Sequence, residues 1–275
     1  MIFSIWTSYG NPLVRKNTWC DVTFSHPEIP IRLKDAHRAC GENARNTVCV
    51  VIDILRATTN IAAILENGCP AIYPCASPEM ALELAQKLRL RHGSEKIILG
   101  GEQDGKPIEG FDGGNSPLEY TRRRIGGKTL ILSTSNGTKT LSAVQCCGEI
   151  FTAAFVNITA TAEKVASILD ANPNQSLLIA CSGREGAYCE EDAVGAGMLL
   201  HILSKYVEKL EFSDTARAAL HVAHGAEKNL EKMLFHSWWG KHLSALGLDE
   251  DISFCAQKDI TRIVPKLDDG VIRIA

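Results

Sequence analysis

VCVVIDILRATTNIAAILENG, residues 48–68, decides the fold, because an apolar run ends at a carboxylate and turns at once into a helical pattern. Five of the seven residues 48–54 are β-branched, which is typical of a strand buried on both faces. Asp53 lies at the end of this strand, and Arg56 adds a planar cation in the turn. Thr58 and Thr59 can cap the helix that follows, so that its free N–H groups and positive dipole end face a crevice. The alternative is an ordinary helix cap beside a solvated charge.

Strand patterns and helical patterns alternate from residue 47 onward. The sequence predicts strands near 47–54, 70–75, 96–100, 129–133, 149–155 and 176–181, with helices at about 58–67, 77–92, 137–146, 158–171 and 190–207. Helical residues then fill 213–257, and residues 271–274 form a last strand. This alternation predicts an α/β fold, a three-layer α/β/α arrangement around a mostly parallel or mixed sheet. Residues 1–275 are expected to form one unit, or two closely packed α/β subdomains, and 1–46 carry the least clear pattern.

Composition limits the class of protein. The 275 residues are 45% hydrophobic and 22% charged, which indicates a globular protein large enough for a full core. A net charge of -3 without a basic tract argues against nucleic-acid binding. The absence of a long apolar window, and of a basic segment before the first apolar residues, predicts a cytoplasmic protein without a membrane segment. Ten cysteines with no CxxC spacing are expected to be reduced core residues, and the chemistry is not expected to use a thiol.

Three further loops carry polar side chains, and each directly follows a predicted strand. GGEQDGKPIEGFDGGNSP at 100–117 has six glycines and four carboxylates, STSNGT at 133–138 offers hydroxyl and backbone N–H groups, and CSGREGAYCEED at 181–192 adds an arginine and more acids. Ligands of open α/β sheets bind outside the carboxyl ends of the strands. Together with Asp53, the loops combine carboxylates with anion-binding groups, as a magnesium-dependent phosphate enzyme requires. Each loop taken alone is also explained as a turn.

Other metal and phosphate motifs are incomplete. GGKT at 126–129 lacks the upstream glycine of a P-loop and precedes a strand. Leu55 stands where an aspartyl-phosphate enzyme of the DxD type has its second aspartate. HVAH at 221–224 lacks the HExxH pattern, and the acidic loops favour a hard metal over zinc. HSWWGKH at 236–242 can line a pocket, although packing in the core or an interface is the simpler interpretation.

The sequence resembles the 2-phosphosulfolactate phosphatase (ComB) family in five segments that occur in the same order. They are IDILRATT at 52–59, the loops at 100–117, 133–138 and 181–192, and GKHLSALGLDEDISFCAQKDITRIVP at 240–265. The resemblance covers about 47–275 and leaves 1–46 unmatched. It implies a magnesium-dependent phosphoric monoester hydrolase that converts 2-phospho-3-sulfolactate to 3-sulfolactate and phosphate, a step towards coenzyme M. It also implies an α/β fold unlike that of the common phosphatases.

The resemblance assigns site residues by position. Those expected to be catalytic are Asp53, Arg56, Glu102 and Asp192. The carboxylates expected to hold Mg²⁺ are Asp53, Glu102, Asp112, Glu191 and Asp192. Substrate is expected to be bound by Thr58, Thr59, Asn115, Ser116, Asn136, Gly137, Thr138 and Arg184. Gln103 departs from the pattern, because the family is expected to have arginine there, and Arg184 can replace the lost charge.

The favoured mechanism is metal-assisted attack of water on phosphorus, with Arg56 and helix N–H groups stabilising the developing charge. A covalent aspartyl-phosphate on Asp53 is the other route, and both remain open at this point. Two other functions also remain open: a phosphatase of another small acid- or sugar-phosphate, and a non-catalytic anion-binding protein. The expected partner is a small anionic phosphoester rather than a nucleic acid or a membrane, and a homo-oligomer is left open.

Overall fold

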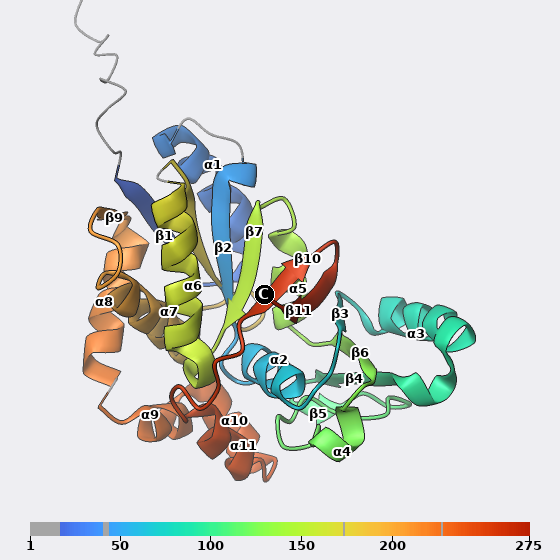
Figure 1. Ribbon diagram of the computed structural model, residues 1–275. Helices are drawn as coiled ribbons and strands as arrows, with labels where there is room; N and C mark the ends of the chain where they lie inside the picture. The colour runs from blue at the N-terminus through green and yellow to red at the C-terminus, as the bar shows by residue number, and fades with distance from the viewer. Residues whose placement is uncertain (1–16, 41–43, 173, 227) are drawn as a thin grey trace, which may run out of the picture.

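The computed structural model describes residues 17–40, 44–172, 174–226 and 228–275 (Figure 1). Their strands are β1 (Thr18–Thr23), β2 (Thr47–Ile52), β3 (Ile72–Cys75), β4 (Ile97–Gln103), β5 (Lys106–Pro107), β6 (Thr129–Ser133), β7 (Glu149–Ala153), β8 (Ser176–Cys181), β9 (Leu210–Phe212), β10 (Pro265–Asp268) and β11 (Val271–Ile274). Their α-helices are α1 (Ile29–Cys40), α2 (Ala57–Glu66), α3 (Pro78–His92), α4 (Arg122–Ile125), α5 (Gly137–Ala143), α6 (Ile158–Ala171), α7 (Glu190–Leu203), α8 (Asp214–Ala226), α9 (Leu230–His236), α10 (Trp238–Ala245) and α11 (Asp249–Cys255).

The strands form one mixed sheet in the order β5-β4-β6-β3-β11-β10-β7-β2-β8-β1-β9. Two parallel blocks, β4-β6-β3 and β7-β2-β8-β1-β9, are joined by the antiparallel hairpin β10/β11, which lies in the middle of the sheet (Figure 1). The hairpin pairs with β7 through Leu267 and with β3 through Ile272. The predicted last strand is therefore confirmed, and the C-terminal segment completes the centre of the sheet.

Helices cover both faces of the sheet, which confirms the α/β fold with three layers. Val50 and Ile52 of β2 point to the face covered by α6, α7 and α8. Cys49 and Val51 point to the opposite face, where α2 and α5 pack. Successive residues of a strand point to opposite faces, so the β-branched run of β2 is buried on both sides, as predicted. A smaller hydrophobic cluster lies between α3 and the strands β4 and β6.

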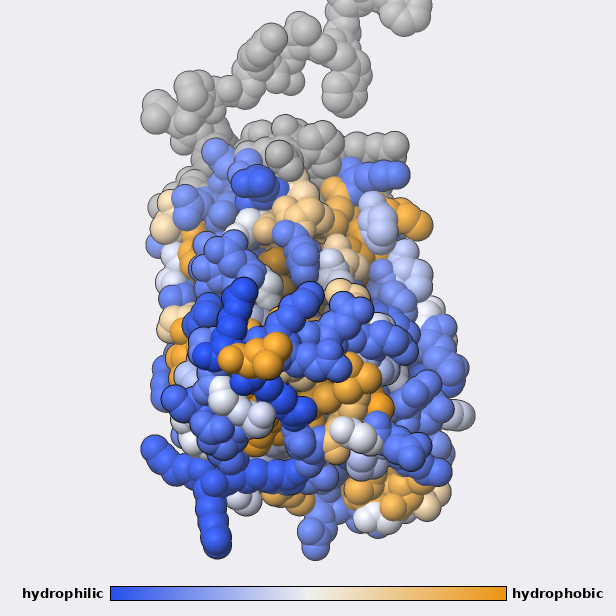
Figure 2. Space-filling model, turned by 90° about the vertical axis from the view of Figure 1, so that its right-hand side faces the viewer, coloured by the Kyte–Doolittle hydropathy of each residue, from blue (hydrophilic) through white to orange (hydrophobic). Residues whose placement is uncertain are grey.

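The end of the molecule formed by α3 and its neighbouring strands is mainly hydrophilic (Figure 2). Met80, Leu82 and Leu90 of α3 are exposed there among charged side chains, as is common on protein surfaces. No helix of the described residues is both long and apolar enough to cross a membrane. The nine cysteines whose side chains the structure describes are free thiols.

Strand register brings the polar loops to one edge of the sheet. Ile52 at the end of β2 lies opposite Cys181 of β8, so the segments that begin with Asp53 and Ser182 leave the sheet side by side. In the other parallel block, β4 and β6 are aligned so that Gly101 lies opposite Ser133. The carboxyl ends of the strands are thus aligned within each block, as the fold class requires.

Two parts of the chain differ from the prediction. β4 continues through Gly100 and Gly101 to Gln103, so Glu102 belongs to a strand and not to the loop. Glycine is required there, because a Cβ atom on Gly100 would overlap the Tyr120 hydroxyl and one on Gly101 would overlap the carbonyl oxygen of Ser133. The N-terminal part, which had the least clear pattern, contains β1 and α1, and β1 pairs with β8 in parallel.

Candidate active site

Side chains from all four polar segments line one small cavity of about 20 Å³. The cavity borders an open cleft of about 550 Å³, and Glu102 and Arg184 line both. The predicted residues that line the cavity are Asp53, Arg56, Glu102, Asn115, Asn136, Arg184, Glu191 and Asp192. The structure therefore brings together eight of the predicted residues from distant parts of the sequence.

Asp53 directly follows β2, and its side chain is held against the start of α2. Its Oδ1 accepts a hydrogen bond from the backbone N–H of Ala57 at 3.1 Å. Its Oδ2 faces the backbone of Gly137, where an added Cβ would lie 2.8 Å from this oxygen. Burial raises the pKa of Asp53 to about 6; the bond from Ala57 opposes this rise, and the charge of Glu102 adds to it. Because Gly137 has no side chain, it does not crowd the Asp53 carboxylate.

Glu191 and Asp192 lie in the first turn of α7 and are almost fully buried. Asp192 accepts hydrogen bonds from the N–H groups of Ile54 at 2.9 Å and Gly183 at 3.0 Å, which ties the segments after β2 and β8 together. Burial raises the pKa of Glu191 to about 7 and that of Asp192 well above its ordinary value, and the charge of Asp53 contributes to both. These neighbouring carboxyl groups oppose one another's ionisation.

Glu102 joins the segments that follow β4 and β6. One carboxylate oxygen accepts a hydrogen bond from the N–H of Gly105 at 2.8 Å, and the other accepts one from the N–H of Ser135 at 2.7 Å. Both bonds fix the carboxylate at the boundary between the cavity and the cleft.

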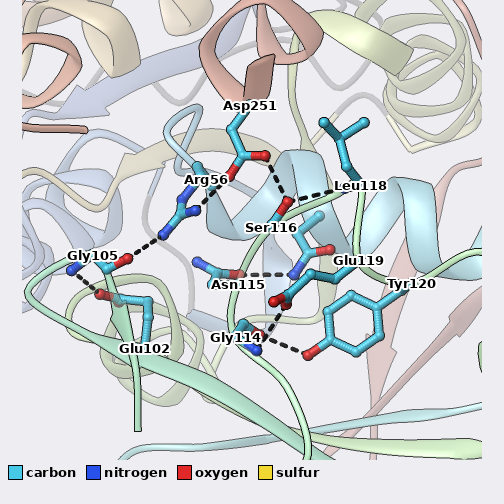
Figure 3. A network of polar contacts seen from close by, with 11 residues as sticks. Arg56, Glu102, Gly105, Gly114, Asn115, Ser116, Leu118, Glu119, Tyr120 and Asp251 are labelled. Carbon is cyan, nitrogen blue, oxygen red and sulfur yellow. Dashed lines mark hydrogen bonds and ion pairs between the residues drawn. The ribbon is translucent and has the colours of Figure 1, made fainter. Parts of the chain in front are cut away.

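Arg56 is buried, and its guanidinium is held from two sides (Figure 3). Nη1 donates to Asp251 Oδ2 at 2.5 Å, and Nη2 donates to the carbonyl oxygen of Gly105 at 2.8 Å. The other oxygen of Asp251 accepts a hydrogen bond from the Ser116 hydroxyl at 2.6 Å. Asp251 lies on α11, 195 residues from Arg56, and the sequence did not predict it as part of the site.

Asn115 lies beside this network. Its Oδ1 accepts a hydrogen bond from the side chain of Asn60 at 2.8 Å, which directs the amide nitrogen the other way. In Figure 3 that nitrogen points toward the side where Arg56 and Gly105 lie. Asn60 is fully buried in α2 and is a further supporting residue that the sequence did not reveal.

The predicted hydroxyl ligands bond to the protein itself. Thr58 and Thr59 lie within the first turn of α2, and their hydroxyls donate to the carbonyl oxygens of Asp53 and Ile54. The expected threonine cap with free N–H groups is therefore absent, since Asp53 accepts the N–H groups of both Ala57 and Thr58.

Two other hydroxyl groups predicted to bind substrate also form hydrogen bonds within the protein. The Thr138 hydroxyl donates to the carbonyl oxygen of Thr134, and the Ser116 hydroxyl donates to Asp251. Their contribution to the site is to hold its loops in place.

Asp112, predicted as a metal ligand, is not brought to the cavity. Its carboxylate binds Arg89 at 2.6 Å and the N–H of Leu99 at 2.8 Å, and its side chain is 47% exposed. The glycine-rich loop turns this carboxylate back onto β4 instead of toward the other acids.

The C-terminal helices add an aromatic wall. Trp239 lines the cavity, and it stacks with His242, the ring centroids being 4.6 Å apart. The guanidinium of Arg184 lies over the ring of Trp238, 3.7 Å from its centroid. Trp238, Trp239 and His242 of the HSWWGKH segment line the cleft, and Trp239 also packs against the hydrophobic core, so the segment combines both of the roles considered for it.

Cys189 also lines the cavity. Burial raises the pKa of its thiol well above the ordinary value, and the charges of Glu191 and Asp192 raise it further. The thiol is therefore neutral and a poor nucleophile.

Carboxyl groups outnumber guanidinium groups in the cavity. Four carboxylates, Asp53, Glu102, Glu191 and Asp192, face two guanidinium groups, and that of Arg56 is already paired with Asp251. Within the described part of the chain, no three His, Cys, Asp or Glu side chains form a ready-made metal site. Mg²⁺ does not need such a set, because it usually binds through one or two carboxylates together with water and phosphate. The donors present fit a divalent cation that is completed by a ligand.

Comparison with known proteins identifies the family. A family model described as 2-phosphosulpholactate phosphatase matches residues 35–270. The chain belongs to this family. Three relatives, each named probable 2-phosphosulfolactate phosphatase, come from Clostridium acetobutylicum (33% identical; 84% of this chain and 94% of the relative covered), Thermotoga petrophila (35%; 81% and 89%) and Clostridium novyi (36%; 82% and 91%). The resemblance found in the sequence is confirmed, and phosphatases of this name are phosphoric monoester hydrolases. The match begins at residue 35, upstream of the 47 expected for this family.

Proposed function

We propose that this protein is a magnesium-dependent phosphatase that hydrolyses 2-phospho-3-sulfolactate to 3-sulfolactate and phosphate. The observation that carries the proposal is the excess of buried carboxylates in the cavity, together with membership of the family. Phosphate is itself an anion, and the ionised carboxylates of the cavity would repel it. A divalent cation held by these carboxylates would remove that repulsion and supply a charge that binds phosphate.

Asp53 and Glu191 are the proposed metal ligands. Both oxygens of Asp192 already accept backbone N–H groups, and so do both oxygens of Glu102. Oδ2 of Asp53 lies beside Gly137, which has no side chain to crowd this oxygen. When bound, Mg²⁺ would polarise the phosphoryl oxygens.

The side chains around the metal site have separate roles in this proposal. Arg56 uses two of its five N–H groups on Asp251 and Gly105, so others remain to donate to phosphoryl oxygens. Asn115 offers its amide nitrogen to the same group. Glu102, fixed where the cavity meets the cleft, is the proposed acceptor of the proton from the attacking water.

The cleft would receive the rest of the substrate. The cavity is small, so the part of the substrate beyond the phosphoryl group must lie outside it. Arg184 and Lys139 line the cleft and can meet a sulfonate or carboxylate, but Asp104 and Glu185 also line it. This mixture of charges favours, as a second candidate, another small acid- or sugar-phosphate as the substrate.

The test is phosphate release by the purified protein, in Mg²⁺, from 2-phospho-3-sulfolactate, 2-phospholactate, glucose 6-phosphate and p-nitrophenyl phosphate. We expect kcat/KM to be highest for the sulfonated substrate by about tenfold or more. Glu102→Gln should lower it by about a hundredfold, because it removes a proton acceptor. Asp112→Asn is the matched control and should change it by less than about threefold, since this carboxylate lies outside the cavity. A preference for another phosphoester would assign the second candidate, and phosphate binding without turnover of any substrate would indicate an anion-binding protein.

A further inference from the structure

Asp251 connects three parts of the chain that meet at the cavity. It lies in the first turn of α11, and only 3% of its surface is exposed. One carboxylate oxygen binds Arg56, which precedes α2, and the other binds Ser116, which lies between β5 and α4. A buried carboxylate needs such partners, and both of its oxygens have one.

The contacts of Asp251 fix the orientation of the Arg56 guanidinium. Asp251 accepts from Nη1 and Gly105 accepts from Nη2, so the planar group is held at two of its three nitrogens (Figure 3). Gly105 is in turn held by Glu102 at 2.8 Å. Arg56 also lines the cavity, so unused N–H groups of its guanidinium can donate on that side.

We propose that Asp251 is a positioning residue for phosphate: it holds Arg56 so that the free N–H groups meet the phosphoryl oxygens. This inference rests on the proposed phosphatase function. Asp251 cancels the formal charge of Arg56, so its contribution is geometric: hydrogen-bond donors that are oriented before the substrate arrives need no rearrangement during the reaction. Through Ser116, the same carboxylate also keeps the neighbouring Asn115 in place beside Arg56.

The inference is tested with a double-mutant cycle of Asp251→Asn and Arg56→Met. Asp251→Asn keeps the size and one acceptor but loses the charge-assisted bond, and it should weaken binding of inorganic phosphate in Mg²⁺ by about tenfold. Its kcat/KM for 2-phospho-3-sulfolactate should fall by about ten- to a hundredfold. Because Asp251 acts through Arg56, the double variant should be no worse than Arg56→Met, within about threefold. The affinity for Mg²⁺ should be unchanged in Asp251→Asn.

Asp21→Asn is the matched control. Asp21 is 1% exposed, and its carboxylate accepts hydrogen bonds from the hydroxyls of Ser213 and Thr215, yet it does not line the cavity. This variant should keep phosphate affinity and kcat/KM within about threefold of the unmodified protein. Thermal unfolding of each variant verifies that it is folded.

Two results would overturn the positioning role: unchanged phosphate affinity in folded Asp251→Asn, or losses in Asp251→Asn and Arg56→Met that add fully in the double variant. Additive losses would mean that Asp251 supports the fold of α11 independently of Arg56. The proposed function fails differently, because the unmodified protein would then release no phosphate from any substrate. If the unmodified protein releases no phosphate, binding of inorganic phosphate measured by calorimetry still tests the positioning role of Asp251.

Discussion

Replacing Asp53 with asparagine should stabilise the metal-free protein at pH 8 while abolishing catalysis. Asparagine has almost the same shape, and its side-chain oxygen can still accept the N–H of Ala57, which is 3.1 Å from Asp53 Oδ1. It removes a buried negative charge that faces three other carboxylates of the cavity. The metal-binding and catalytic role proposed for Asp53 depends on that charge, so stability and activity should change in opposite directions.

The magnitude follows from the pKa of Asp53, which burial raises from 3.8 to about 6. A carboxyl group whose pKa is raised on folding contributes stability below its unfolded pKa and loses it as the pH rises through the folded value. Between about pH 4 and pH 6 the metal-free protein should therefore lose about 3 kcal/mol through Asp53. Asp53→Asn avoids this loss, and the corresponding gain in melting temperature at pH 8 is about 5 °C for a chain of this length.

The assay is thermal unfolding followed by circular dichroism in excess EDTA, at pH 8 and at pH 4. Asp53→Asn should unfold at a higher temperature than the unmodified protein at pH 8, and at the same temperature at pH 4. Adding Mg²⁺ at pH 8 should raise the melting temperature of the unmodified protein and leave that of the variant unchanged. If Asp53→Asn is less stable than the unmodified protein at pH 8 in EDTA, the reasoning about the buried charge is refuted.

Three further predictions address the chemistry of the cavity. Arg56→Lys should lower kcat/KM by about ten- to a hundredfold in saturating Mg²⁺, because the ammonium group of lysine cannot bond Asp251, Gly105 and a phosphoryl group at once. An unchanged kcat/KM would show that Arg56 is a purely structural residue. Gly137→Ala should lower both Mg²⁺ affinity and kcat by about tenfold, because its Cβ would lie 2.8 Å from Asp53 Oδ2. Gly225→Ala is the control and should change neither, since the space around Gly225 is open. Equal activity of the two variants would contradict the crowding argument. Rapid acid quenching during a single turnover, with enzyme in excess, should show no phosphorylated peptide that contains Asp53, since we expect direct attack of water; a phosphorylated Asp53 peptide would establish the covalent route instead.

Local sequence patterns were sufficient to predict most of the fold. The β-branched run before Asp53 predicted β2 because burial on both faces requires such a run, and the polar segments after the strands predicted which edge holds the site. The position of the β10/β11 hairpin was beyond such reasoning. The strand at 271–274 was predicted, but the insertion of the hairpin between β3 and β7 depends on pairings with residues far away in the chain.

The candidate site shows the same division between local and distant contacts. Asp53, Glu191 and Asp192 could be predicted because each lies at or close to the end of a strand or the start of a helix. Asp251 and Trp239 could not, since they lie on helices near the C-terminus, where Asp251 binds Arg56 and Trp239 lines the cavity, and no periodicity marks them. Asp112 lies in the segment that carries the family resemblance, but a resemblance does not show in which direction a carboxylate points.

The central claim, that the buried carboxylates hold a cation on which phosphate release depends, is tested most directly by removing and restoring the metal. Phosphate release from 2-phospho-3-sulfolactate should stop when the purified protein is treated with excess EDTA, and it should return when Mg²⁺ is added in excess of the chelator. Glu191→Gln should need a higher Mg²⁺ concentration for half-maximal activity, because it removes one of the two proposed ligands. Full activity in EDTA would contradict the account.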